Sequence, residues 1–205
     1  MTLITEYHYF SPVIFFKKSI DFSDIEFDIY DVYQKMSFRN RCVIAGADGP
    51  IILSVPLEGG RNQRKPMKEV RIDNRKDWQV QHWRTIVSCY NRSPWFEFYR
   101  DELDMLYQGN FSFLAGWDEA CFQWVSGKIG LPVKSQVGNE PRQGDDDTGK
   151  CDWRNRFIPA TISHDFPEAV KYRQVFEERT GFMPHLSVLD LLFCEGKNAL
   201  RILSR

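Results

Sequence analysis

The stretch 33–41 carries the residues best suited to bind a charged group, and it reads Tyr33-Gln34-Lys35-Met36-Ser37-Phe38-Arg39-Asn40-Arg41. Successive side chains of an extended chain point to opposite faces, so Arg39 and Arg41 would share one face and Phe38 and Asn40 the other. Two guanidinium groups on one face make a fork that suits a carboxylate or a phosphate. A solvated edge strand explains the same alternation, so this stretch alone leaves both interpretations open.

A second cluster places a histidine among indoles, in the stretch Trp78-Gln79-Val80-Gln81-His82-Trp83-Arg84. On a helix, Trp78 and His82 lie one turn apart on one face, with Gln79 and Trp83 on the next. An imidazole beside indoles is typical of a wall that binds a sugar or a base and carries a proton-transfer group. A histidine satisfied inside an aromatic core fits the spacing equally well.

Two single residues have positions that bear on catalysis. His8 follows an apparent strand and precedes Ser11-Pro12, so it is expected at the carboxyl end of a strand, where α/β sheets commonly carry catalytic groups. Cys194 lies beside Glu195 late in a predicted helix, whose dipole raises the pKa of a thiol. The position of Cys194 therefore disfavours a nucleophilic role.

Two charged segments are typical of surface loops. Residues 61–68 hold two arginines and two lysines without an acid, which could steer a polyanionic ligand but also suits a soluble loop. The segment 135–150 is rich in glycine and acid and predicts a flexible surface loop. Its triplet Asp145-Asp146-Asp147 does not converge on one point by itself, so we predict no metal site.

Composition excludes several classes of protein. The 205 residues include 27 Lys+Arg and 28 Asp+Glu, a net charge of -1, which argues against a general nucleic-acid binder. Five widely spaced cysteines predict free thiols rather than disulfides or a zinc site. No glycine-rich nucleotide loop occurs, so we expect no cofactor. The opening residues lack a signal-peptide pattern, and no run approaches the roughly 18 apolar residues of a membrane helix. We therefore expect a cytoplasmic protein without a membrane span.

The elements that position these residues follow from local patterns. Alternation and turn residues predict strands at 3–6, 25–29 and 70–73 and a hairpin of 42–45 with 51–55. Helical spacing and capping residues predict helices over 12–18, 77–90, 95–107, 111–129, 172–179 and 188–194. The aromatic stripes of the third and fourth of these helices are expected to be core. The predicted fold is α+β (mixed α/β), one domain over 1–205, with N-terminal strands and a hairpin packed against a helical middle and C-terminal part.

Taken together, these stretches resemble the WbqC-like protein family over nearly the whole chain. The resemblance is carried by Tyr7-His8-Tyr9-Phe10-Ser11-Pro12, the stretch 33–41, Gly49-Pro50 through Ser54-Val55-Pro56, Trp78 with His82-Trp83-Arg84-Thr85-Ile86, and Leu186-Ser187-Val188-Leu189-Asp190-Leu191-Leu192. Asp152-Trp153-Arg154-Asn155 is similar to the family's Asp-Leu-Arg-Asn segment, and His185 stands where asparagine is expected. The resemblance implies a link to bacterial surface-polysaccharide synthesis, including O-antigen.

Two hypotheses follow. In the first, the protein is a transferase that modifies an activated or amino sugar. Its catalytic residues would be His8, His82 and Asp190, and its substrate-binding residues Tyr33, Lys35, Arg39, Asn40, Arg41, Trp78 and Trp83. In the second, it is a non-catalytic sugar-phosphate-binding or assembly protein of the same pathway. The ligand is a small molecule or activated sugar in both, and the oligomeric state stays open. The first hypothesis expects His8, His82 and the polar residues of 33–41 to line one cleft.

Overall fold

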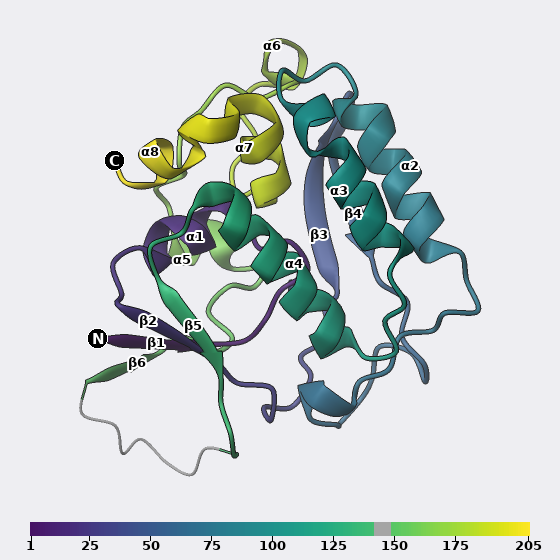
Figure 1. The fold of residues 1–205 in the computed structure, drawn as a ribbon, viewed down its shortest axis with the longest axis vertical. Helices are drawn as coiled ribbons and strands as arrows, with labels where there is room; N and C mark the ends of the chain where they lie inside the picture. The colour runs from purple at the N-terminus through teal and green to yellow at the C-terminus, as the bar shows by residue number, and fades with distance from the viewer. Residues whose placement is uncertain (142–148) are drawn as a thin grey trace.

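The structure is a computed structural model that describes residues 1–141 and 149–205 (Figure 1). Its parallel sheet holds β1 (Thr2–Thr5), β2 (Asp24–Phe27), β5 (Lys134–Val137) and β6 (Lys150–Asp152), and an antiparallel hairpin holds β3 (Arg41–Gly46) and β4 (Gly49–Ser54). The helices are α1 (Val13–Ser19), α2 (Trp78–Tyr90), α3 (Phe96–Gln108), α4 (Leu114–Ile129), α5 (Ile162–Asp165), α6 (Glu177–Thr180), α7 (Val188–Glu195) and α8 (Ala199–Leu203), with short 3-10 turns η1 (Met67–Glu69) and η2 (Gly196–Asn198). The α+β prediction is confirmed.

The parallel sheet has the strand order β5-β2-β1-β6. Leu3 of β1 lies opposite Ile25 of β2 on one side and Cys151 of β6 on the other. The chain thus adds strands on one side of β1 and later returns to its other side, so the order reverses between β1 and β6. In open parallel sheets, ligands bind outside the carboxyl ends of the strands at such a reversal.

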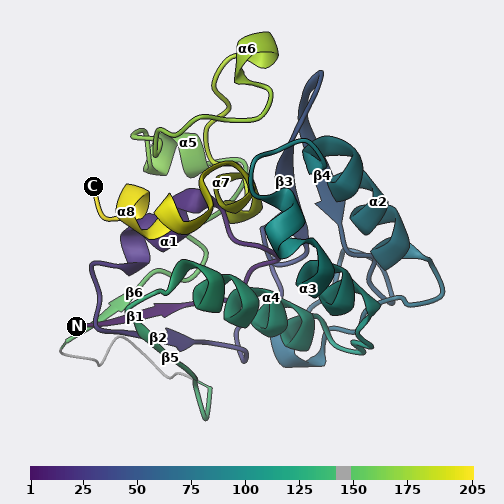
Figure 2. The same cartoon turned by 45° about the horizontal axis from the view of Figure 1, so that its top comes forward.

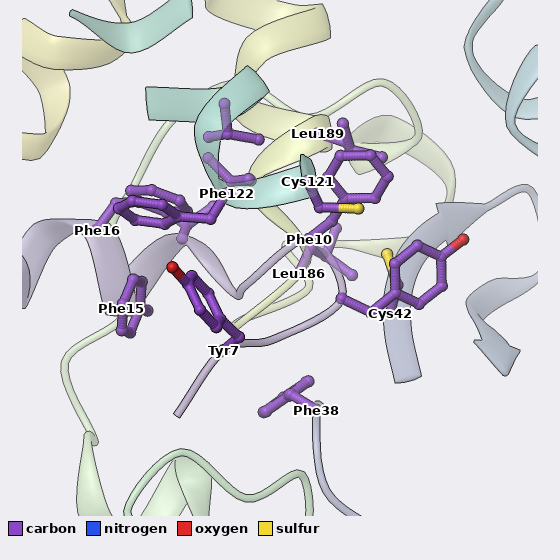
Figure 3. Close-up of a cluster of buried hydrophobic side chains, with 14 of the residues drawn as sticks. Tyr7, Phe10, Phe15, Phe16, Phe38, Cys42, Cys121, Phe122, Leu186 and Leu189 are labelled. Atoms are coloured by element: carbon purple, nitrogen blue, oxygen red, sulfur yellow. The ribbon is translucent and has the colours of Figure 1, made fainter. Parts of the chain in front are cut away.

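In both views, α4 lies between the parallel sheet and the hairpin, and the hairpin lies with α2 and α3 (Figures 1 and 2). Aromatic rings fill the space between α4 and the sheet. The ring of Tyr7 stacks on Phe27 at 3.7 Å, and Phe122 of α4 meets Phe27 edge-on at 4.7 Å. Figure 3 shows side chains of the N-terminal segment, α1 and α4 converging in this cluster.

The buried face of α4 lies about one residue away from the core stripe predicted for the helix over 111–129. We expected Phe113, Trp117, Ala120 and Trp124 on that stripe, and Trp117 is buried, but Phe113 precedes the first residue of α4 and is exposed. The buried face of α4 instead holds Leu114, Trp117, Asp118, Cys121, Phe122, Val125 and Ile129. Leu114, Cys121 and Val125 each follow a predicted position by one residue, so the buried face lies slightly to one side of the predicted stripe.

Three other elements differ from the predictions. The expected strand 70–73 is an irregular segment that makes only single bridges, Arg71 to Phe113 and Leu57 to Ile72, after η1. The helix expected over 172–179 is reduced to α6, because the Gln174 amide is held by the backbone of Met183 at 2.7 and 2.8 Å. The expected loop 135–150 begins inside β5, which pairs with β2, and its triplet 145–147 lies outside the described residues.

Candidate functional site

Five polar residues meet beyond the carboxyl ends of β1, β2 and β6, where the strand order reverses. We call Glu6, His8, Asp31, Arg39 and Asn155 the switch-point cluster. Glu6 and His8 follow β1, Asp31 follows β2, and Asn155 follows β6, while Arg39 comes from the segment before β3. The parallel arrangement of the strands brings these distant segments to one edge of the sheet.

Glu6 and His8 form the inner pair of the cluster. Oε1 of Glu6 lies 3.3 Å from Nε2 of His8, and Nδ1 of His8 lies 3.3 Å from Oγ of Ser11. The backbone N–H of Asn155 also donates to both oxygens of Glu6. Burial, the largest effect, raises the pKa of Glu6, but His8, Arg39 and the Asn155 N–H together lower it below its usual value. Glu6 is therefore a buried carboxylate within 3.3 Å of the imidazole of His8, although Nε2 of His8 makes no hydrogen bond among the described residues.

The turn that returns Ser11 to His8 contains an unusual backbone angle. Phe10 has φ 43°, in the left-handed region that bulky residues rarely adopt. Its carbonyl accepts a hydrogen bond from Oγ of Ser187 at 2.9 Å, and its ring is buried. Packing and this hydrogen bond hold the chain in the conformation that the Ser11–His8 contact requires.

Arg39 is completely buried and joins three segments. Its Nη1 donates to the carbonyl of Val32 at 2.6 Å, and its Nη2 donates to Oδ2 of Asp31 at 2.7 Å and to Oδ1 of Asn155 at 3.0 Å. The backbone N–H of Asn155 binds Glu6 while its side-chain Oδ1 accepts from Arg39. Asn155 has φ 60°, a left-handed conformation that asparagine tolerates. Its Nδ2 also donates to Asp31.

The remaining residues of 33–41 surround this cluster in different ways. The hydroxyl of Tyr33 donates to Oδ1 of Asn40 at 2.9 Å, and Asn40 in turn donates to the carbonyl of Val55. Burial raises the pKa of Tyr33 to about 12. Lys35 is exposed and reaches Asn62 at 3.4 Å. Arg41 is half-buried at the start of β3.

His82 lies in a separate aromatic environment on α2. Its Nδ1 is 2.9 Å from the hydroxyl of Tyr9, and burial lowers the pKa of His82 to about 4. The Trp78 ring meets it edge-on at 5.3 Å, and the half-buried Trp83 stacks on Phe96 at 6.0 Å. His82 is therefore neutral at physiological pH.

Asp190 lies in a third place, on α7. Its Oδ1 accepts a hydrogen bond from the hydroxyl of Tyr90 at 2.9 Å, and burial raises the pKa of Asp190 to about 6. Within the described ranges 1–141 and 149–205, no hydrogen bond or ion pair joins it to His8 or His82.

The structure thus joins His8 and Arg39 through Glu6 and Asn155, and it hydrogen-bonds Tyr33 to Asn40, the residue after Arg39. Sequence patterns did not single out Glu6, Asp31 and Asn155. A signal existed for Asn155, which ends the Asp152–Asn155 motif. Another existed for Asp118, a carboxyl group in the apolar stripe of α4.

Two kinds of feature are absent from residues 1–141 and 149–205. No group of three or more His, Cys, Asp or Glu side chains in this part of the chain could hold a metal ion. None of the described helices has both the length and the apolar character that crossing a membrane requires.

Comparison with known proteins agrees with the resemblance of the sequence. A family model described as the WbqC-like protein family matches residues 8–152, which include His8, Asp31 and Arg39. The "Uncharacterized protein Rv1507c" of Mycobacterium tuberculosis (strain ATCC 25618 / H37Rv) is 25% identical over 198 residues, with 85% of each chain covered. No solved structure matches the chain.

Proposed function

Because the chain belongs to the WbqC-like protein family, we propose that it is a cytoplasmic bacterial transferase of surface-polysaccharide synthesis that modifies an activated or amino sugar. The observation that carries the proposal is that Oγ of Ser11 and Oε1 of Glu6 each lie 3.3 Å from a ring nitrogen of His8, at the carboxyl edge of the sheet. A histidine held between a carboxylate and a hydroxyl is a typical general base. Its place beside the reversal of strand order is where parallel sheets bind ligands.

In this proposal, His8 removes a proton from the acceptor group of the substrate. Glu6 orients the imidazole and stabilises the imidazolium that forms, since Glu6 stays ionised inside the core. We assign the base to His8 rather than His82, because burial lowers the pKa of His82 to about 4 and makes it a weak base.

The anionic part of the substrate is assigned to Arg39 and Arg41. Both Nη atoms of Arg39 donate to protein groups, while its Nε–H has no partner among the described residues, and we assign this N–H to the ligand. The guanidinium of Arg41 has no carboxylate partner among residues 1–141 and 149–205, and it is half-exposed. Arg41 would therefore meet the phosphate or carboxylate first, with Tyr33, Lys35 and Asn40 beside it.

Ligand binding and turnover test the proposal separately. We expect the melting temperature of the wild type to rise with at least one nucleotide sugar or amino sugar, since a ligand at 100 times its dissociation constant adds about 2.7 kcal/mol. The variant His8→Gln should keep this shift and lose about 10²–10⁴-fold in turnover. The matched control is His164→Gln, because the His164 side chain is exposed and faces Asp165, outside the switch-point cluster. A wild type that responds to none of these sugars would contradict the proposal.

A second candidate function is a non-catalytic binding or assembly protein of the same pathway. The observation that favours it is the burial of the cluster, in which His8 is 1% and Arg39 0% exposed. Under this alternative, His8→Gln binds sugar as the wild type does, and no sugar is turned over by either protein.

A further inference from the structure

Asp118 is a buried carboxyl group that the proposed mechanism does not use. It lies on the core-facing side of α4 between Leu114 and Phe122, and it is 0% exposed. Neither of its oxygens has a hydrogen-bond partner among the described residues. Buried polar groups in proteins almost always have a partner, so an orphaned carboxyl group needs an explanation.

Packing places Asp118 against the segment that follows β2. Phe122, one turn further along α4, packs on Phe27 at the end of β2. Helix α4 contacts η1, where the backbone N–H groups of Met67 and Lys68 donate to the carbonyls of Asp31 and Ile29. The segment of Ile29 and Asp31 continues to Tyr33, and besides burial, the charge of Asp118 raises the pKa of Tyr33. Asp118 therefore borders the switch-point cluster from the side of α4.

Arg39 supplies a second orphaned group at this border. Its Nε has no partner within the described part of the chain, although both Nη atoms do. Arg39 is also the charged residue that acts on Asp118. One side of the cluster therefore offers two unused groups, a carboxyl and an N–H donor.

Asp118 is the group at this border that suits a cationic partner. The other charges nearby are close to balanced, since Glu6 and Asp31 contribute two carboxylates and Arg39 and Arg41 two guanidinium groups. Burial raises the pKa of Asp118 well above its usual value, and Arg39 offsets only part of that rise. Burial therefore works against the ionised form of Asp118, and a positive group beside it would favour that form.

We propose that Asp118 recognises a protonated amino group of the substrate, while Nε of Arg39 donates to a neighbouring oxygen of the same molecule. This inference rests on the proposed function, because it takes the switch-point cluster as the substrate site. It narrows the substrate class to sugars with a free amine. An amine gives the carboxyl oxygens the donors that the protein lacks, whereas an N-acetyl group brings no charge. Asp118 releases its proton to solvent when the ammonium group arrives.

A matched pair of probes tests this assignment. Binding of UDP-glucosamine and of UDP-N-acetylglucosamine is measured by titration calorimetry in two buffers of different ionisation enthalpy. We expect the wild type to prefer the free amine by roughly 10- to 100-fold and to release about one proton with it. Asp118→Asn should lose both the preference and the proton release. Asp101→Asn, at an exposed position of α3, should retain both. Equal affinity of the wild type for the two probes, or an unchanged preference in Asp118→Asn, overturns the inference.

If neither probe binds, that result counts against the proposed function itself. The stability of a second variant then tests the role of Asp118 separately. Asp118→Leu replaces an orphaned carboxyl group with an apolar side chain of similar size. If the carboxyl is kept for a ligand, this variant melts at a higher temperature than the unliganded wild type. A lower melting temperature would show that Asp118 supports the fold, and the inference would fail.

Discussion

The hydroxyl of Tyr9 lies 2.9 Å from Nδ1 of His82, inside the core and away from solvent. The same hydroxyl is 2.6 Å from the hydroxyl of Tyr107, so His82 ends a short buried chain of polar groups. The neutral imidazole satisfies Tyr9, but an imidazolium there would be a buried charge without a carboxylate contact among the described residues. This relationship makes stability depend on pH.

Acid should destabilise the protein through His82. Burial lowers its pKa from 6.5 to about 4, so the folded state binds the proton less well than the unfolded state. The stabilisation is complete above pH 6.5 and is lost as the pH falls toward 4, a change of about 3 kcal/mol. Urea unfolding at a series of pH values checks this. His82→Gln should flatten the curve in this window, while His164→Gln should leave it unchanged, because His164 is exposed.

Asp190 should produce the opposite dependence. Burial raises its pKa from 3.8 to about 6, so the folded state holds the proton more tightly than the unfolded state. Its favourable contribution is present below pH 3.8 and is lost as the pH rises through 6, a change of about 3 kcal/mol. The free energy of unfolding of Asp190→Asn, relative to the wild type, should therefore increase between pH 4 and 6 and then level off. A difference that is independent of pH would contradict the burial of an ionisable group here.

Replacing Arg39 by lysine should cost both stability and ligand binding. Lysine keeps the charge but loses the planar fork that holds Val32, Asp31 and Asn155 together. We expect Arg39→Lys to lower the free energy of unfolding by about 2–4 kcal/mol. Arg41→Lys, at a half-buried position, should change it by less than about 0.5 kcal/mol. Two variants of equal stability would mean that the buried contacts of Arg39 contribute little to the fold.

Two glycines should respond to alanine with opposite signs. A Cβ on Gly196 would lie 2.1 Å from the ring of Trp95, and the residue has φ 53°. Gly196→Ala should therefore destabilise the protein by at least about 2 kcal/mol. Gly116, on the exposed side of α4, has open space at its Cβ. Gly116→Ala should stabilise the protein by roughly 0.5–1 kcal/mol, because alanine favours the helix. Thermal unfolding of both variants measures the contrast.

Elements governed by neighbouring residues could be predicted from the sequence. The hairpin of β3 and β4 and the helices α2 and α3 lie within a few residues of their predicted ranges. The predicted start at Ser187 is confirmed, since its Oγ accepts the N–H of Leu189 at the beginning of α7. In these elements, the apolar spacing and the capping residue act locally.

The parts missed by sequence reasoning depend on distant partners. Ser135 pairs with Ile25 in the sheet, although the composition around it is that of a loop. The switch-point cluster was missed for the same reason, because strand order alone brings Glu6 and Asn155 together. At position 185, histidine replaces the asparagine expected from the resemblance. His185 has φ 57°, a backbone conformation that asparagine and histidine both adopt more readily than most residues.

The strand order also determines when each edge of β1 can pair while the chain is being synthesised. β1 is made first, and β2 can pair with one of its edges soon afterwards, but its other edge pairs with β6 at Lys150–Asp152. At roughly 5–20 residues per second, a ribosome needs on the order of ten seconds to reach β6. During that interval the nascent chain carries an unpaired apolar strand edge, which invites pairing with other chains. Nascent-chain folding is therefore most exposed to aggregation before residue 150, and a chaperone that covers the N-terminal strand would act in that interval.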